Sequence, residues 1–273
     1  MSELDIDCPL VARVLEEFLR VELGRFGFSR GVVGLSGGVD STVSTFLAAR
    51  ALGAENVTAV LMPYSGSSPA SEADAMAVVE ELGINYLQIE ITPQIDAYFE
   101  RFPDANRLRR ANKMARERMT ILYDQSAALG ALVIGTSNKT EALLGYTTLW
   151  GDMACAVNPL GDLYKTQLRQ LAGHLGVPRQ IIEKPPSADL WPGQTDEGEL
   201  GFTYEDVDQV LYRLVDLRLR PEEMVAEGFP EEFVRRVWDM VRQSQYKRRL
   251  PLVAKLSRRS LDRDFRYPRD WEA

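Results

Sequence analysis

The feature that most constrains this chain is a glycine-rich junction near its start. An apolar run at residues 31–35 leads into the sequence SGGVDS at residues 36–41, and a helical pattern follows. Adjacent glycines permit positive φ angles and a close approach of the main chain to a ligand, while the first N–H groups of a helix can face an anion. This order of strand, tight turn and helix predicts a phosphate-binding loop at the end of a strand.

The loop differs from the Walker phosphate loop in the charge that it carries. It has no GxxxxGK[ST] lysine, and its first helical turn contains Asp40 instead. A carboxylate repels bare phosphate, whereas Mg²⁺ binds one or two carboxylates together with phosphate oxygens. Asp40 is therefore expected to be a Mg²⁺ ligand. The alternative interpretation is an Asp that caps the helix beside a glycine-rich turn.

The pattern of apolar runs predicts the fold class. Such runs recur at residues 32–35, 57–62, 86–91 and 132–135, with helical segments between them. Strands that are apolar on both faces and alternate with helices predict an α/β fold, a doubly wound parallel sheet with helices on both faces. Ligands of such sheets bind at the carboxyl ends of the strands.

Helical patterns cover the rest of the chain. An amphipathic helix around residues 10–19 precedes the first strand, a long helix is expected over 106–129, and residues after 165 are helical in pattern. Ser71 and Thr203 have the chemistry of helix caps. We expect one domain over residues 1–273, with a core sheet at about 30–190, a helical C-terminal part at about 200–250 and a basic tail at 251–273.

Composition excludes several classes of protein. The chain of 273 residues has a formal net charge of −8, which argues against general nucleic-acid binding. No apolar stretch is long enough to span a membrane, the acidic N-terminus does not resemble a signal peptide, and two cysteines fit a reducing compartment, so a cytoplasmic protein is expected. A single histidine argues against Ser-His-Asp hydrolases and multi-histidine zinc enzymes.

Basic residues dominate the segment from Arg242 to Arg269. Such a run is either a solvated surface or a tail that closes over an anionic ligand, and the sequence does not separate the two interpretations.

A second strand end carries polar chemistry. The last apolar run continues into GTSNKTE at residues 135–141, which places Glu141 at the start of a helix. Glu141 is well placed to share a metal ion with Asp40. The alternative is an acidic residue that only stabilises the positive end of the helix dipole.

These blocks together resemble the NAD synthetase family of the N-type ATP pyrophosphatases. The resemblance rests on LSGGVDS and GTSNKTE, then Gly145-Tyr146 and Gly151-Asp152, and on the later blocks NPLGDLYKT (158–166), KPPSADL (184–190) and TDEGELG (195–201). It covers roughly residues 30–250, and ordered blocks are more specific than one loop. It implies an adenine nucleotide alpha hydrolase-like fold.

The resemblance implies a two-step amidation of deamido-NAD with ATP as co-substrate and Mg²⁺ as cofactor. The nicotinate carboxylate attacks the α-phosphate of ATP and releases pyrophosphate, and ammonia then displaces AMP from the adenylate to give NAD. Adenylation supplies a leaving group, and such phosphate chemistry depends mainly on charge neutralisation and positioning.

The family's roles are carried over by motif position. They give catalytic roles to Asp40, Asp152 and Lys165, and the metal to Asp40 and Glu141; ligand-binding roles fall to Ser36, Gly37, Gly38, Ser41, Thr136, Ser187, Asn112, Arg116, Glu199 and Lys247. Of these, Ser36 to Ser41 would hold pyrophosphate, and Thr136 would lie near the adenylate. Asn112 and Arg116 would bind deamido-NAD. For Arg116 and Lys247, a solvated helix charge is the alternative.

The chain departs from the family at two positions. The arginine that contacts adenine in many members corresponds to Leu61, and an acidic residue associated with ammonia corresponds to about Ala156. The resemblance therefore implies that the base is recognised more by backbone and apolar contacts.

The remaining expectations concern partners. No glutaminase domain precedes the glycine loop, so free ammonia is the expected nitrogen donor unless a separate amidotransferase subunit delivers it. The resemblance implies a homodimer, with no nucleic-acid or membrane partner expected. The alternatives are another adenylating enzyme of the same loop type, directed at tRNA or GMP synthesis, and a non-catalytic nucleotide-binding regulator.

Overall fold

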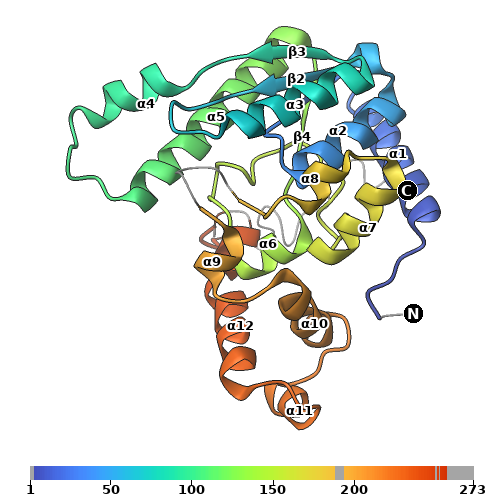
Figure 1. Ribbon diagram of the computed structural model, residues 1–273, viewed down its shortest axis with the longest axis vertical. Coiled ribbons are helices and arrows are strands. Elements are labelled where there is room, and N and C mark those ends of the chain that lie inside the picture. The colour runs from blue at the N-terminus through green and yellow to red at the C-terminus, as the bar shows by residue number, and fades with distance from the viewer. Residues whose placement is uncertain (1–2, 188–193, 250, 252, 257–273) are drawn as a thin grey trace.

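The structure, a computed structural model, describes residues 3–187, 194–249, 251 and 253–256. In this part of the chain four parallel strands form one sheet in the order β3-β2-β1-β4 (Figure 1). The strands are β1 (Gly31–Gly34), β2 (Val57–Leu61), β3 (Asn85–Gln88) and β4 (Leu132–Ile134). The predicted doubly wound parallel sheet is confirmed, and each strand starts within one residue of the predicted run.

Alternating side chains of the strands enter two different cores. Val33, Ala59 and Ile134 pack on one face, and Val32, Val60 and Val133 pack on the other. The first face is covered by α1 (Cys8–Arg25), α2 (Val39–Leu52), α3 (Pro69–Leu82), α7 (Lys165–Leu175) and α8 (Arg179–Glu183), and the second by α4 (Thr92–Phe99) and α5 (Arg107–Leu129). Burial on both faces explains why β1, β2 and β4 are continuous apolar runs, whereas the edge strand β3 has the sequence NYLQ and is mostly exposed.

A third core lies below the sheet in Figure 1 and joins the C-terminal helices. The helices in this region are α6 (Lys139–Leu144), α9 (Asp196–Leu200), α10 (Tyr204–Val215), α11 (Pro221–Ala226) and α12 (Glu231–Gln243), followed by a 3-10 turn at Gln245–Arg248. Tyr204, Val207 and Val237 are among its fully enclosed side chains. Most of the basic tail and residues 188–193 lie outside the described residues.

Two predicted helix starts can be compared with the structure. Thr203 caps α10 and accepts a hydrogen bond from the N–H of Asp206, as predicted. The cap expected at Ser71 is wrong, because α3 begins at Pro69, with Ser68 at the cap position. Proline is pre-organised for the first helical position, and it starts this helix two residues earlier than the Ser71 pattern indicated.

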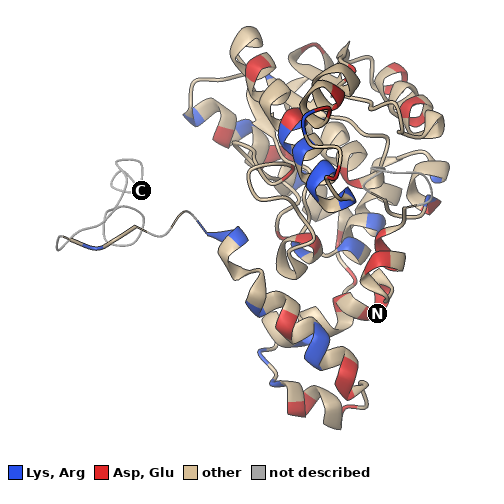
Figure 2. Cartoon of the chain, turned by 90° about the vertical axis from the view of Figure 1, so that its left-hand side faces the viewer, with Lys and Arg blue, Asp and Glu red and all other residues tan. Residues whose placement is uncertain are grey.

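Among the described residues, no helix is both long and apolar enough to cross a membrane. In Figure 2, positions of Lys and Arg and of Asp and Glu both occur on the C-terminal helices, whereas one helix of the sheet-bearing part that faces the viewer carries mainly Lys and Arg.

One buried carboxylate fixes the C-terminal helices to the sheet-bearing part. Asp208 on α10 has no exposed surface, and it accepts hydrogen bonds from the hydroxyls of Thr140 on α6 (2.6 Å) and Thr166 on α7 (2.8 Å) and from the Thr166 N–H (2.8 Å). Burial raises the pKa of Asp208, while these hydrogen bonds oppose that rise. Three helices therefore depend on a single acceptor.

We expect Asp208→Ala to lower the free energy of unfolding by about 3 kcal/mol, because it leaves buried donors without an acceptor. Asp208→Asn keeps one acceptor oxygen and should cost about 1 kcal/mol. Urea denaturation followed by circular dichroism measures both. The control is Asp239→Ala, an exposed change on α12. Equal stability of the Asp208→Ala and control variants would contradict the assigned role.

Candidate active site

The site lies at the point where the direction of strand addition reverses. The chain runs outward from β1 to β2 and β3 and then returns to the other side of β1 with β4. At such a point a crevice forms at the carboxyl ends of the two neighbouring strands, here β1 and β4, and ligands of parallel sheets bind there. The SGGVDS loop follows β1, and the TSNKTE segment follows β4. The side-chain amide of Asn138 joins the two segments by donating to Asp40 Oδ1 at 2.8 Å.

The glycine loop presents main-chain donors at the start of α2. Gly38 is the cap residue of α2, and no side chain caps that end. The hydroxyls of Ser36 and Ser41 lie 3.1 Å apart, and Ser41 Oγ accepts from the Ser36 N–H at 3.2 Å. An uncapped helix start beside two hydroxyls is suited to binding phosphate oxygens.

Gly37 cannot be replaced without moving the backbone. It has a φ of 78°, and a Cβ built on it would lie 2.0 Å from the carbonyl oxygen of Ser71 on α3. The positive φ and the close approach both require glycine here. Lys184 reaches the same helix and donates to Ser71 Oγ at 3.0 Å and Asp74 Oδ2 at 2.9 Å. The loop is thus held against the first turns of α3.

Three predicted residues meet at one point beside the loop. The ammonium of Lys165, whose side chain is only 2% exposed, lies 2.5 Å from Asp40 Oδ2 and 3.4 Å from Glu141 Oε1. Glu141 is fixed by a reciprocal capping box with Asn138 at the start of α6. The carboxylates of Asp40 and Glu141, from two different strand ends, therefore converge on one cation.

The electrostatics of this group are strongly perturbed. Desolvation, with the nearby charge of Asp40, raises the pKa of Glu141 to about 8, although Lys165 opposes the rise. Burial alone would lower the pKa of Lys165, but the carboxylates of Asp40 and Glu141 outweigh it and raise that pKa. Lys165 is therefore a permanent cation in this site, and groups perturbed in this way cluster at functional sites.

The donor set fits a hard divalent cation that brings its own further ligands. Among residues 3–187, 194–249, 251 and 253–256 no three His, Cys, Asp or Glu side chains form a ready metal cage. Mg²⁺ does not require one, because it is bound by one or two carboxylates plus phosphates and water. Asp40 and Glu141 already converge on a single positive charge, as two such ligands must.

A second group of predicted residues surrounds the loop between α6 and α7. Asp152 Oδ1 accepts from the Thr148 N–H at 2.6 Å, and the hydroxyl of Thr148 donates to Asn112 Oδ1 on α5 at 2.8 Å. Arg116, one turn further along α5, donates to the Leu149 carbonyl at 3.3 Å. Lys247 donates to the carbonyls of Gly145 and Thr147, both at 2.7 Å. The structure thus brings Asn112, Arg116, Asp152 and Lys247 to one loop, residues 145–152.

The other predicted residues lie around these two groups. The carboxylate of Glu199 accepts from Tyr146 Oη at 2.7 Å and from Gln194 Nε2 at 3.1 Å, which connects α9 to the 145–152 loop. Thr136 is half-buried just beyond the end of β4, and Ser187 is exposed. Residues 188–190, the rest of the KPPSADL block, lie outside the described part of the chain.

A hollow of about 280 Å³ lies at the carboxyl ends of β2 and β3. It is lined by Pro63, Tyr64, Ser65, Ser67, Pro69, Glu72, Gln88 and Glu90. Leu61 is not among these residues, because its side chain is 2% exposed and packs in the core. The position that carries the adenine-contacting arginine in many members of the resembled family thus serves the sheet here.

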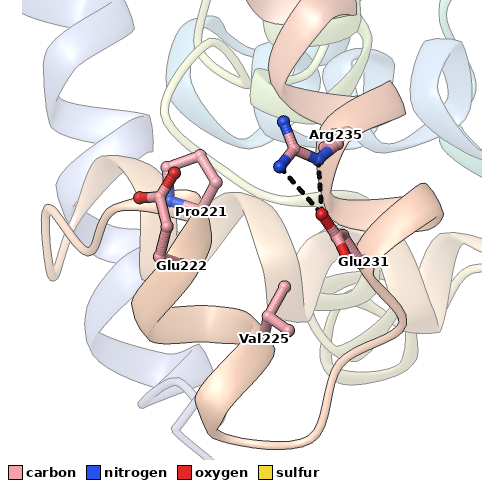
Figure 3. Close-up of a pocket in the computed structure, with 5 residues that line it drawn as sticks. All are labelled: Pro221, Glu222, Val225, Glu231 and Arg235. Atoms are coloured by element: carbon pink, nitrogen blue, oxygen red, sulfur yellow. Dashed lines mark hydrogen bonds and ion pairs between the residues drawn. The ribbon is translucent and has the colours of Figure 1, made fainter.

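A smaller hollow of about 150 Å³ lies between α11 and α12 (Figure 3). It is lined by Pro221, Glu222, Val225, Glu231 and Arg235, and the Glu231 and Arg235 side chains form an ion pair at 2.8 Å. None of the predicted site residues lines it.

Sequence reasoning missed two residues that organise the site. Asn138 holds Asp40 and caps α6, and its place three residues before Glu141 is a capping signal that the sequence does contain. Asp196 is buried beside the carboxylate group, and it lies within the TDEGELG block without a role assigned from sequence.

The chain is similar to known proteins over most of its length. The NAD synthase family model matches residues 11–251. A protein of Trichlorobacter lovleyi named NH(3)-dependent NAD(+) synthetase is 59% identical over 271 residues, which cover 99% of each chain.

Two solved structures share the fold. The NH3-dependent NAD synthetase of Campylobacter jejuni aligns with a TM-score of 0.79 and 32% identity, and the NMN synthetase of Francisella tularensis with 0.82 and 31%. Each alignment covers 92% of this chain and 100% of the other. Because the family model matches residues 11–251 and a relative is 59% identical over nearly the whole chain, the chain belongs to the NAD synthase family.

Proposed function

We propose that this protein is an NH3-dependent NAD synthetase that converts deamido-NAD, ATP and ammonia into NAD, AMP and pyrophosphate. The observation that carries the proposal is the convergence of Asp40, Glu141 and Lys165 beside an uncapped glycine loop. This arrangement matches the chemical need to hold a triphosphate through its negative charges. Relatives that are more than half identical carry the same name.

The phosphate side of the reaction falls to the glycine loop and its neighbours. The N–H groups at the start of α2 and the hydroxyls of Ser36 and Ser41 bind pyrophosphate oxygens. Asp40 and Glu141 are the residues that would hold Mg²⁺. When bound, Mg²⁺ neutralises charge on the leaving pyrophosphate. Lys165 adds a fixed positive charge beside these two carboxylates, at a position that excludes water. Thr136 and Ser187 lie on the adenylate side.

The acceptor side falls to the 145–152 loop. Asn112 and Arg116 bind deamido-NAD, while Asp152, Glu199 and Lys247 lie toward its nicotinate end. The nicotinate carboxylate oxygen attacks the α-phosphorus as the bond to pyrophosphate breaks. Ammonia then attacks the acyl carbon, loses a proton, and AMP leaves with the electron pair of the broken C–O bond. The hollow at the ends of β2 and β3 accommodates the adenine through backbone and apolar contacts.

The assembly that we propose is a homodimer joined through α1. Leu10, Val14, Phe18 and Val21 repeat along one face of this helix and are 36–57% exposed. Exposed apolar side chains that repeat on one helix face are suited to a partner helix. The free thiols of Cys8 and Cys155 fit a cytoplasmic location.

The direct test is turnover of the purified protein. With ATP, Mg²⁺, ammonium and deamido-NAD it should form NAD and AMP in equal amounts. When deamido-NAD is omitted, it should release no pyrophosphate from ATP. Because one structural relative is an NMN synthetase, a parallel assay offers the mononucleotide acceptor and measures NMN. Nucleotide binding with neither product would favour a non-catalytic regulator. Higher kcat/KM for the mononucleotide would change the assigned acceptor.

Asp40→Asn should lower kcat for NAD formation by about a hundredfold, because an amide is a poor ligand for a hard cation. The fold should persist, since the substituted side chain retains an oxygen that accepts from Asn138. Steady-state kinetics and thermal unfolding measure the two effects. Asp162→Asn, at a carboxylate that is 97% exposed, is the control. Near-normal turnover of the Asp40→Asn variant would disprove the assignment.

Arg116→Ala should raise KM for deamido-NAD about tenfold and leave KM for ATP within about twofold, because it removes a contact to one substrate only. The matched control is Arg109→Ala, since Arg109 lies on the same helix but packs over Phe102. Initial rates with each substrate varied in turn give the two constants. An equal rise in both KM values would argue for a general loss of structure instead.

A further inference from the structure

Asp196 is a buried carboxylate whose role the reaction scheme above leaves open. It is the first residue of α9 and only 5% exposed. The hydroxyl of Tyr204 on α10 donates to its Oδ2 at 3.1 Å. Its Oδ1 is buried and accepts no hydrogen bond within the described residues. The nearby hydroxyl of Tyr146 donates to Glu199 instead, at 2.7 Å, and it also helps to lower the pKa of Asp196. A buried carboxylate oxygen without a partner is costly, and in a native site it requires an explanation.

The charges that act on Asp196 identify what it faces. Burial raises its pKa, and the strongest opposing influence is the positive charge of Lys165. Asp196 in turn is one of the carboxylates that raise the pKa of Lys165. The ammonium itself lies closer to Asp40 and Glu141, with which it forms ion pairs. Asp196 is therefore a third carboxylate near the lysine that the ammonium does not contact in this state.

Lys165 cannot keep its two ion pairs while Asp40 and Glu141 hold a divalent cation. Its side chain is 2% exposed, so water does not replace the lost partners. An uncompensated charge at a buried position is strongly destabilising. Of the nearby carboxylates that influence Lys165, only Asp196 is neither an assigned cation ligand nor already bound to the ammonium.

Tyr204 is placed to coordinate this exchange. The Lys165 ammonium lies 5.1 Å from the centre of the Tyr204 ring, and the hydroxyl of the same ring holds Asp196. A cation beside an aromatic face is attracted to it. One fully buried tyrosine thus contacts both the lysine and the carboxylate.

We propose that Asp196, held by Tyr204, is a positioning residue that takes over the ammonium of Lys165 when Asp40 and Glu141 turn to a divalent cation. The proposal rests on the proposed function in one respect, namely that a cation and ATP bind at this site. Asp196 therefore acts through Lys165 and is not itself a cation ligand. If Asp196 acts in this way, replacing it changes the affinity for the cation more when Lys165 is present than when Lys165 has been replaced.

The test is a double-mutant cycle with a binding readout. Mn²⁺ binding in the presence of α,β-methylene ATP, which cannot release pyrophosphate, is measured by electron paramagnetic resonance. The four proteins are the wild type, Asp196→Asn, Lys165→Met and the double variant. If the two residues act independently on the cation, Asp196→Asn changes the Mn²⁺ dissociation constant by the same factor in the wild type and in the Lys165→Met variant.

We expect Asp196→Asn to weaken Mn²⁺ binding about tenfold more in the presence of Lys165 than in the Lys165→Met background, a size typical of coupling between sites. The reason is that the lysine, when deprived of its alternative partner, competes with the cation for Asp40 and Glu141. The same factor in both backgrounds would overturn the proposal, because a direct ligand or a purely structural residue gives that result. No effect in either background would also overturn it.

Two further variants keep the proposal testable if Asp196→Asn does not fold. Tyr204→Phe keeps the ring and the carboxylate but removes the hydroxyl, and it should show coupling of the same sign with Lys165→Met. Asp216→Asn is the matched control, since it removes the charge of another carboxylate that accepts from a tyrosine, here from Tyr164 Oη at 2.5 Å. Its effect on Mn²⁺ binding should be the same in both backgrounds. Coupling for Asp216 as large as that for Asp196 would contradict a specific role.

The outcomes separate this proposal from the proposed function. A wild type that binds Mn²⁺ and the analogue with the expected coupling, but forms no NAD, would refute the acceptor assignment alone. A wild type that forms NAD without coupling would refute the role of Asp196 alone. A wild type that binds neither Mn²⁺ nor the analogue would refute both.

Discussion

The ion pairs of Lys165 with Asp40 and Glu141 are the interaction on which the rest of the structure depends. Lys165 is the first residue of α7, and its backbone N–H donates to the hydroxyl of Thr140 at 3.0 Å. Thr140 in turn donates to Asp208 on α10. The same residue therefore joins the two strand ends of the sheet to the C-terminal helices. Its helix packs in the core on one face of the sheet, where Leu168 and Leu171 are completely buried.

The sequence predicts the sheet well because its signal is local. Runs such as Val32 to Leu35 are apolar on both sides, and burial on both faces permits no other pattern. The proximity of Asp40 and Glu141 could also be predicted, since each follows a strand and the carboxyl ends of parallel strands share one edge. The expected cap at Ser71 failed for a local reason too, because a proline two residues earlier starts the helix.

The residues that sequence analysis missed depend on distant packing. Asp196 resembles any acidic residue at a helix start, and its burial results only from the docking of α9 against Tyr204. Its N–H also donates to the Pro186 carbonyl at 2.9 Å, which places it beside Ser187. Nothing in the spacing of the TDEGELG block indicates that Lys165, about thirty residues earlier in sequence, lies opposite. Polar groups of this kind are specified by tertiary structure.

The departure at Leu61 has a similar explanation. A leucine at the end of β2 completes the core above α2 and α3, so this position contributes to the sheet and not to a ligand. A guanidinium reaches this strand end from α5 instead, where Arg118 Nε donates to the Met62 carbonyl at 3.0 Å. The hollow beyond it is lined by prolines, serines and Tyr64, together with Glu72, Gln88 and Glu90. Leu61 is buried in the core, so it contributes no contact in this hollow.

The charge balance of the site determines what can enter it. Asp40, Glu141 and Asp196 place three carboxylates around the single ammonium of Lys165, so the group is negative overall when all are ionised. A triphosphate is repelled by such a group, and the partial positive charge at the start of α2 is too small to compensate. The anion must therefore arrive with cations, or a carboxylate must be protonated. Burial and the charge of Asp40 raise the pKa of Glu141, which favours protonation of this carboxylate in the free site. The charge balance therefore supports our proposal that the nucleotide binds together with a divalent cation.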